Sequence, residues 1–318
     1  MTALLQSWAF HLAHALWQTT LAATAILVLL RALRGTSPRL RHALAMIGIV
    51  KFVLPPMLPL PTGVFSAAPP VPELTLVRDG IASLDPRVVL ALFLLHAGGA
   101  VIALARLAWE AWRLRAIVRG ARPSQDAATS TRYLLSDEIG VPLTAGIFRP
   151  VILIPTTLAR SLTPAELEDV LAHEAQHIRT RDTLLNTMQA IVAALWWFHP
   201  LVHRLASTAR GLREERCDDA LLAGGTCTRA HYARTLLQAA TFVSGKAPAA
   251  AAAIAESPHS LLQRIRRISD ARFTPSARLG ATAVLLLLVT ALLLLPGLRI
   301  SASNRFAFDH ATRHALHH

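Results

Sequence analysis

Residues 171–182, LAHEAQHIRTRD, combine side chains that can bind and use a metal ion. His173 and His177 stand four positions apart, so on a helix both imidazoles project from one face and can reach one ion. Glu174 follows the first histidine, where it could accept a proton from an attacking water without binding the ion. The five-residue motif also arises by chance on solvated helices. It therefore indicates a zinc peptidase only together with a third ligand.

The segment GLREERCDDALL, at 211–222, offers that third ligand. A catalytic zinc ion takes three protein ligands and leaves one position open, and two histidines with one glutamate form such a set. Glu214 is the predicted ligand, and Asp218, one helical turn later, could accept the other ring N–H of a ligating histidine. Glu215 is the rival ligand, with Asp219 as its companion, because it lies about 100° around the helix. The residues alone favour Glu214 only mildly.

Other polar residues have candidate supporting roles. Asp182 is expected to cap a helix or to pair with Arg179 or Arg181, and a role behind a metal ligand is the alternative. A hydrogen-bond donor must also stabilise the oxyanion that develops during peptide hydrolysis, a role worth roughly 3 to 4 kcal/mol. The candidates for this donor are Tyr232, His231 and His199, and packing between helices is the alternative for each.

The two histidines are expected to lie on a single helix. Thr163 is a candidate N-cap, Pro164 suits the first helical position, and Glu166 completes a capping box. The helix that these residues start would run without interruption through His173 and His177.

The segment before this helix, residues 132–155, is predicted to form strands. Its apolar runs are separated by Pro142, Gly146 and Pro150, which favours two or three short antiparallel strands. The last run, VILIP at 151–155, could pair with an extended substrate at a sheet edge or be an ordinary structural strand. Strands followed by helices predict an α+β domain.

The composition predicts a membrane protein. Hydrophobic residues make up 53% of the 318 positions and charged residues only 16%, which is more apolar than a typical soluble domain. The net charge of +13 does not indicate nucleic-acid binding, because the basic residues lie beside apolar runs instead of forming one stripe. Two cysteines argue against a disulfide framework and fit a reduced compartment.

Four apolar stretches are candidate transmembrane helices, since a bilayer core about 30 Å thick takes roughly 20 helical residues. They lie at about residues 5–30, 43–60, 88–105 and 277–298. The first is interpreted as an anchor, because it is too long for a cleavable signal peptide and lacks a basic start. Lys51, inside the second stretch, either functions within the membrane or snorkels toward a polar helix interface.

Arginines follow the first and third stretches, and the positive-inside rule places those flanks in the cytoplasm. This orientation predicts four parts of the chain. They are a membrane region with three spans (1–118), a cytoplasmic metallopeptidase domain (119–276), a fourth span (277–298) and a short extracytoplasmic tail (299–318). Both termini are then extracytoplasmic.

Two stretches of the cytoplasmic domain are expected near the bilayer. Residues 183–198 are apolar but shorter than a membrane span, so they predict a buried or membrane-dipping helix. The basic side chains Arg264, Arg266 and Arg267 are expected to contact lipid headgroups.

These motifs resemble the BlaR/MecR-type membrane zinc metallopeptidases. The H-E-x-x-H helix, the RTRD that follows it, the later WWFHP and the EERCD at 214–218 match the order and spacing of that family. Flanking segments extend the likeness over roughly residues 130–275. The resemblance implies a mainly α membrane protein with about four transmembrane helices and a cytoplasmic gluzincin-type domain that holds one Zn²⁺.

The resemblance also implies roles for particular residues. It selects Glu214 over Glu215 as the third ligand, and it favours Tyr232, within YARTLL, as the oxyanion donor. It further implies a location in the bacterial inner membrane. Beta-lactam receptors of this family carry a penicillin-binding sensor after the last span, whereas residues 299–318 are all that follow it here. We therefore expect a family member without that sensor domain.

Three functions are consistent with these features. The favoured one is a signalling peptidase that cleaves a cytoplasmic protein such as a transcriptional repressor, and possible self-cleavage is implied by the resemblance. Membrane lipids, a separate sensor protein and a second copy of the chain are its candidate partners. The alternatives are an HtpX-like quality-control peptidase and a non-enzymatic scaffold with a structural zinc site.

Overall fold

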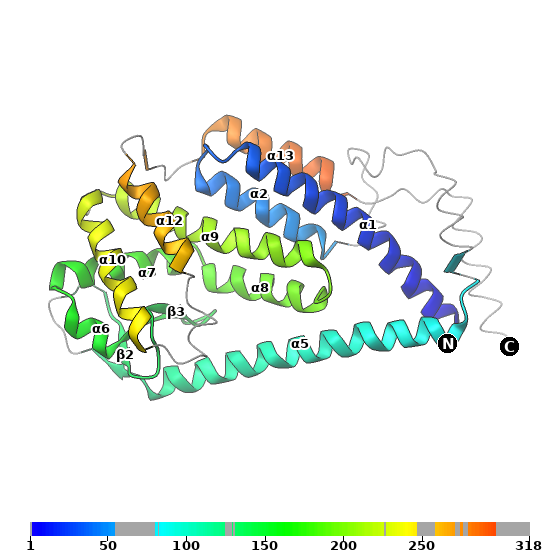
Figure 1. The fold of residues 1–318 in the computed structure, drawn as a ribbon, viewed down its shortest axis with the longest axis horizontal. Coiled ribbons are helices and arrows are strands. Elements are labelled where there is room, and N and C mark those ends of the chain that lie inside the picture. Colours follow the sequence, from blue (N-terminus) through cyan, green and yellow to red (C-terminus); the bar gives the residue numbers. More distant parts are fainter. Residues whose placement is uncertain are drawn as a thin grey trace.

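The computed structural model describes residues 2–54, 80–81, 83–124, 129, 131–225, 227–246, 258–270, 274–275 and 279–296. The helices are α1 (Thr2–Ala32), α2 (Pro38–Lys51), α5 (Pro86–Gly120), α6 (Thr156–Ser161), α7 (Pro164–Arg179), α8 (Asp182–Leu195), α9 (Pro200–Ala223), α10 (Arg229–Lys246), α12 (Pro258–Ser269) and α13 (Ala281–Leu294). The strands are β1 (Arg122–Pro123), β2 (Leu134–Ser136), β3 (Leu143–Ala145) and β4 (Val151–Pro155). The fold is therefore mainly helical, with one small sheet (Figure 1).

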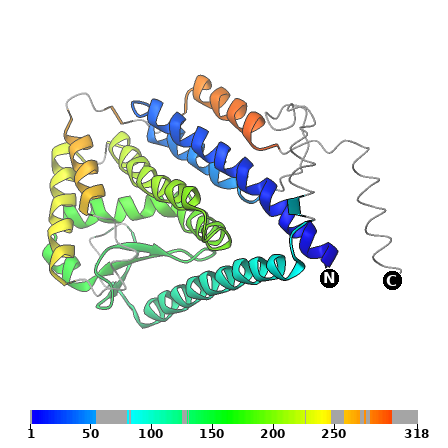
Figure 2. The same ribbon diagram turned by 45° about the vertical axis from the view of Figure 1, so that its right-hand side comes forward.

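The long helices pack around a hairpin formed by α8 and α9. This hairpin lies between the group α1, α2 and α13 on one side and α5 on the other (Figures 1 and 2). Leu205 and Ala209 of α9 are fully buried against α1 and α2. Gly48 of α2 permits the close approach, because a Cβ there would lie 3.0 Å from Leu205 Cδ1. The segment expected to be buried or membrane-dipping is α8, which buries Val192 and leaves Ile191 exposed.

Two described helices are long and apolar enough to cross a membrane. They are the Ala3–Ala32 part of α1 and the whole of α5, while α13 is apolar but shorter. The expected second span differs from the helix found, because Ser37 caps α2 and starts it at Pro38, five residues before the predicted start. α2 ends at Lys51, and residues 55–60 lie outside the described part of the chain. Four membrane spans therefore remain a prediction.

Lys51 extends into a polar interface between helices, which is one of the two roles expected for it. Its side chain is 1% exposed, and Nζ donates to Gln18 Oε1 at 3.1 Å and to the backbone oxygens of Leu295 and Pro296 at 3.1 and 3.0 Å. Carbonyls at the end of a helix lack partners within that helix, and a cation there is favourable. Lys51 thus ties α2 to α1 and to the end of α13.

The sheet contains a parallel pair that the sequence did not predict. Its order is β1-β2-β4-β3, with β2 parallel to β4 and β3 antiparallel to β4. The expectation of antiparallel strands was wrong for β2 and β4, because β3 lies between them in the sequence and forms the hairpin with β4. Gly146 permits that hairpin turn, since its φ is 93° and a Cβ there would lie 2.5 Å from Arg149 O.

The position of β4 also corrects its proposed role in binding substrate. β4 pairs with β2 on one side and β3 on the other, so VILIP is not an edge strand. Ile152 and Ile154 pack toward α6 and α7, whereas Leu153 packs toward the end of α5. The sheet is thus held between α7 and α5, and β1 and β3 are its two outer strands among the described residues.

Candidate active site

The start of α7 forms as its sequence predicts. Thr163 Oγ1 accepts a hydrogen bond from the Glu166 backbone N–H at 3.3 Å, and Glu166 Oε2 accepts one from the Thr163 backbone N–H at 2.9 Å. Pro164 occupies the first helical position, so the predicted capping box is confirmed. The helix runs on to Arg179, and His173 and His177 lie on its buried face.

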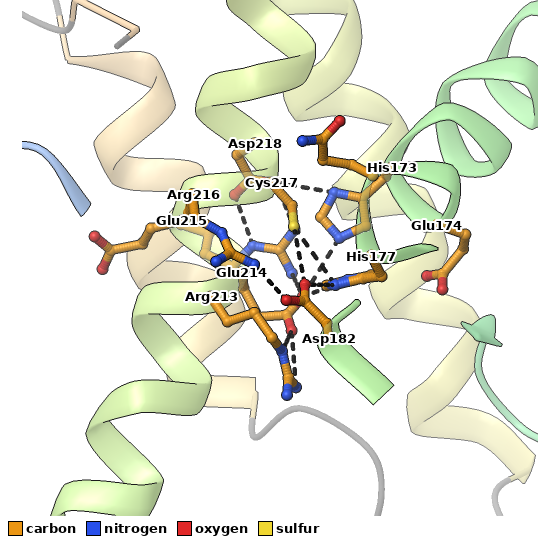
Figure 3. A network of polar contacts seen from close by, with 12 residues as sticks. His173, Glu174, His177, Asp182, Arg213, Glu214, Glu215, Arg216, Cys217 and Asp218 are labelled. Carbon is orange, nitrogen blue, oxygen red and sulfur yellow. Dashed lines mark hydrogen bonds and ion pairs between the residues drawn. The ribbon is translucent and has the colours of Figure 1, made fainter. Parts of the chain in front are cut away.

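Two histidines and one glutamate converge where α7 meets α9. His173 Nε2 lies 3.3 Å from Glu214 Oε2, and His177 Nε2 lies 3.6 Å from the same oxygen. One ligand atom from each of the three residues lies within 4.8 Å of the other two. Figure 3 shows the side chains pointing toward one another from the two helices. Two imidazole nitrogens and a carboxylate oxygen are donors that suit a zinc ion, so the predicted ligand set fits one.

The Nδ1 atom of His173, on the opposite side of the ring from the ligand cluster, contacts two buried polar residues. Tyr232, on α10, has its hydroxyl 2.9 Å from His173 Nδ1 and donates a 2.7 Å hydrogen bond to Asp218 Oδ1. Asp218 Oδ1 itself lies 3.3 Å from His173 Nδ1. An Nδ1–H that donates to these oxygens leaves the Nε2 lone pair directed at the ligand cluster.

The Nδ1 atom of His177 likewise contacts a buried carboxylate. Asp182 Oδ2 lies 2.7 Å from His177 Nδ1. The chain turns sharply between α7 and α8 through Arg181, whose φ is 54°, and this turn returns Asp182 toward α7. Asp182 also pairs with Arg216 of α9, so the expected pairing with Arg179 or Arg181 was wrong and the geometry matches the alternative, a position behind a predicted metal ligand.

The charges around these aspartates favour their ionised forms. Burial opposes ionisation of Asp182, but the hydrogen bond from His177 and the Arg216 guanidinium lower its pKa to about 2. Burial likewise opposes ionisation of Asp218, yet the Arg264 guanidinium holds the pKa of Asp218 well below its usual range. A carboxylate behind each histidine fixes the tautomer that a metal ligand requires.

The Glu174 side chain faces the sheet and lies apart from the ligand cluster. The hydroxyl of Thr144, in β3, is 2.9 Å from Glu174 Oε2 and 3.2 Å from the Glu174 backbone oxygen. Figure 3 shows the Glu174 carboxylate apart from the ligand cluster and directed away from Glu214. Glu174 thus borders the candidate site without joining the ligand set.

Glu215 points away from the histidines, as Figure 3 shows. Its Oε2 lies 3.6 Å from Arg41 Nη1 of α2 and 3.8 Å from Arg267 Nε of α12. Asp219 pairs with Arg267 as well. The geometry therefore separates the two rival carboxylates, with Glu214 at the candidate metal site and Glu215 in a charge cluster between α2 and α12.

The oxyanion donor expected from sequence is not found at the site. The Tyr232 hydroxyl lies at the Nδ1 edge of His173, opposite Nε2, and donates to Asp218. With 1% of its surface exposed, Tyr232 is placed to support His173 and not to reach a substrate. His231 Nε2 faces Asp169 at 3.2 Å, and His199 faces Thr20 of α1 at 3.1 Å.

The sequence did not predict the arginines that pair with the aspartates of α9. Arg264 is 6% exposed and pairs with Asp218, and Arg267 pairs with Asp219, so neither is free to bind lipid headgroups as expected. Arg266 is the exposed member of the three. These contacts cross 46 and 48 positions of sequence, which no local pattern reveals.

The chain matches the BlaR1 peptidase M56 family over residues 11–268. It is 35% identical over 81 residues to the regulatory protein BlaR1 of Bacillus licheniformis, a match that covers 26% of this chain and 13% of that protein. It is 24% identical over 83 residues to the methicillin resistance mecR1 proteins of Staphylococcus aureus and Staphylococcus epidermidis, covering 26% of this chain and 14% of each relative.

The family match spans most of the chain, so the protein belongs to the BlaR1 peptidase M56 family. The predicted BlaR/MecR-type character is thereby confirmed. Family membership indicates a metallopeptidase related to signal-transducing membrane proteins, and the two membrane-length apolar helices agree with that. The alignments with the curated relatives span only 13 to 14% of their lengths.

Proposed function

We propose that this chain is an integral-membrane zinc metalloendopeptidase whose ligands are His173, His177 and Glu214. The observation that carries the proposal is the convergence of two Nε2 atoms and one carboxylate oxygen, with Asp218 and Asp182 on the opposite ring nitrogens. Buried histidines backed by carboxylates are typical of metal sites. An ordinary helix interface has no need for this arrangement.

The chemistry follows from the positions of the remaining side chains. A zinc ion, when bound, acts as a Lewis acid toward a carbonyl oxygen and makes water more acidic. Glu174 accepts a proton from the attacking water on its carboxylate and then passes it to the amine that leaves. Thr144 donates to Glu174 Oε2 and so orients that carboxylate.

We further propose that the substrate binds in an extended form along β3. Thr144 belongs to this outer strand and touches Glu174, so a peptide paired with the side of β3 that no described strand occupies would pass beside the general base. Backbone hydrogen bonds at a sheet edge hold a peptide without requiring a particular side chain. This assignment replaces the expected role of VILIP.

The proposed cellular role is signal transduction. By analogy with the family, the substrate is a cytoplasmic protein such as a transcriptional repressor, or the chain itself. The proposed location is the bacterial inner membrane, with four spans, a cytoplasmic peptidase domain and both termini outside. A separate sensor protein and a second copy of the chain are the proposed partners.

The test compares cells that express the wild type or Glu174→Ala at equal levels. New protein N-termini are mapped by mass spectrometry, and His173→Ala serves as a second inactive variant. One or two cuts present only with the wild type would support a signalling peptidase. Many scattered cuts in membrane proteins would favour quality control. Identical maps, in cells where the signalling response is active, would contradict a proteolytic function and favour a zinc-bound scaffold.

A further inference from the structure

We infer that Arg264 of α12 is a positioning residue for the candidate metal centre and holds His173 in place through Asp218. This inference rests on the proposed function, because it concerns the same ligand set. It adds that the helix leading into α13 completes the site. α7 and α9 supply the ligands themselves, and α12 supplies the guanidinium that pairs with Asp218.

Arg264 donates hydrogen bonds to Asp218 from two of its nitrogen atoms. Its Nε donates to Asp218 Oδ2 at 2.8 Å, and its Nη2 donates to Asp218 Oδ1 at 2.7 Å. Two parallel hydrogen bonds from one guanidinium fix the orientation of a carboxylate as well as its position. Asp218 is fully buried and Arg264 is 6% exposed, so water does not screen this pair.

The restraint passes from Asp218 to the ligand. Asp218 Oδ1 lies 3.3 Å from His173 Nδ1 and accepts the Tyr232 hydroxyl that contacts the same nitrogen. Arg264 also reaches the ligand set directly, since its Nη1 lies 3.7 Å from Glu214 Oε2. One arginine thus touches one predicted ligand and fixes the group that orients another.

The rest of α12 strengthens this contact and links it to the membrane region. Arg267, one turn after Arg264, pairs with Asp219 and lies 3.8 Å from Glu215 Oε2. Glu215 in turn lies 3.6 Å from Arg41 of α2. Arg264 and Arg267 thus connect α12 to α9. A displacement of α12 away from α9 would separate Arg264 from Asp218.

Replacement of Arg264 should weaken metal binding without removing a ligand. Loss of the outer partners of a metal-ligating histidine typically lowers metal affinity by about 10- to 100-fold. We expect a loss of this size for Arg264→Gln. Arg264→Lys keeps the charge but not the paired geometry, so it should give an intermediate affinity. Arg266→Gln is the matched control, because Arg266 is exposed on the same helix.

The experiment uses the full chain purified in detergent and reconstituted with Co²⁺ as the probe. Affinity is measured by competition with a chelator, and visible absorption reports the coordination geometry. Thermal unfolding of the metal-free proteins identifies variants that fail to fold, and Arg264→Lys then provides the test. We expect weaker binding and an altered spectrum for both Arg264 variants and no change for Arg266→Gln.

Two outcomes would overturn the inference, and they are distinguishable. If His173→Ala abolishes Co²⁺ binding but folded Arg264 variants keep the wild-type affinity and spectrum, Arg264 does not position the site. The proposed ligand set survives that result. If the wild type binds no Co²⁺, or His173→Ala binds it equally well, the ligand set fails and the inference fails with it.

Discussion

At the residue scale, Thr144 belongs to no sequence motif, yet its hydroxyl contacts the predicted general base Glu174. The H-E-x-x-H pattern identifies Glu174, but the orientation of its carboxylate depends on a hydroxyl 30 positions earlier, at 2.9 Å. We expect Thr144→Val to lower kcat on the order of 10-fold, a part of the roughly 10²- to 10⁴-fold that a general base contributes. The measurement is steady-state hydrolysis of a peptide by the zinc-loaded protein.

Thr144→Ser is the control for that prediction because it keeps the hydroxyl. It should retain most of the wild-type kcat, and Co²⁺ affinity should be unchanged in both variants, since Thr144 contacts no predicted ligand atom. Equal losses in Thr144→Val and Thr144→Ser would indicate that packing of β3, and not the hydrogen bond, matters.

At the scale of an element, the capping box makes the stability of α7 depend on pH. The backbone hydrogen bond from Thr163 is the main cause that lowers the pKa of Glu166 below its usual value. A lowered pKa in the folded state means that Glu166 stabilises the fold above its unfolded pKa, about 4.3, and loses this contribution as pH falls further. We expect the difference in Tm between wild type and Glu166→Gln to shrink as pH is lowered from 7 toward 3.

Metal-free protein should be used for this comparison, so that the pH dependence of metal binding does not enter. Glu168→Gln, two positions along α7, is the matched control because Glu168 lies outside the capping box. A difference between wild type and Glu166→Gln that stayed constant over this pH range would show that the carboxylate charge does not stabilise the cap.

At the scale of the whole molecule, Lys51 of α2 links the neighbouring helix α1 to the end of α13, which is distant in sequence. It donates to α1 and to the backbone oxygens of Leu295 and Pro296 at the end of α13. Lys51→Met would leave buried carbonyls without this donor, and each unsatisfied group costs about 1 to 3 kcal/mol. We expect a lower Tm in detergent than for the control Val50→Met, which changes an exposed neighbour on α2. An unchanged Tm would mean that other groups satisfy these carbonyls.

The packing of the whole molecule also determines which elements contact each side of the candidate metal site. The predicted ligands come from α7 and α9, the predicted general base faces β3, and the residues that support the histidines come from α8, α10 and α12. α9 packs against α1 and α2 along its apolar face and carries the predicted ligand Glu214 farther along the same helix. The α1 and α2 helices and the candidate site therefore both contact α9.

The sequence by itself determined the features that depend on near neighbours. The helical period puts His173 and His177 on one face, and Thr163 and Glu166 start their helix by hydrogen bonds that span three residues. Apolar composition over whole stretches predicts membrane-length helices, and two of those expected are long enough in the described chain. These properties need no knowledge of where distant segments lie.

Only the tertiary structure decided the features that depend on distant segments. The β2–β4 pair is parallel because β3 lies on the far side of β4, and Arg264 turns from the expected lipid surface to Asp218 because α12 packs on α9. Tyr232 likewise supports His173 because α10 brings its hydroxyl to the far side of the ring. Such contacts join residues that are tens of positions apart, and packing of whole elements, not local pattern, selects them.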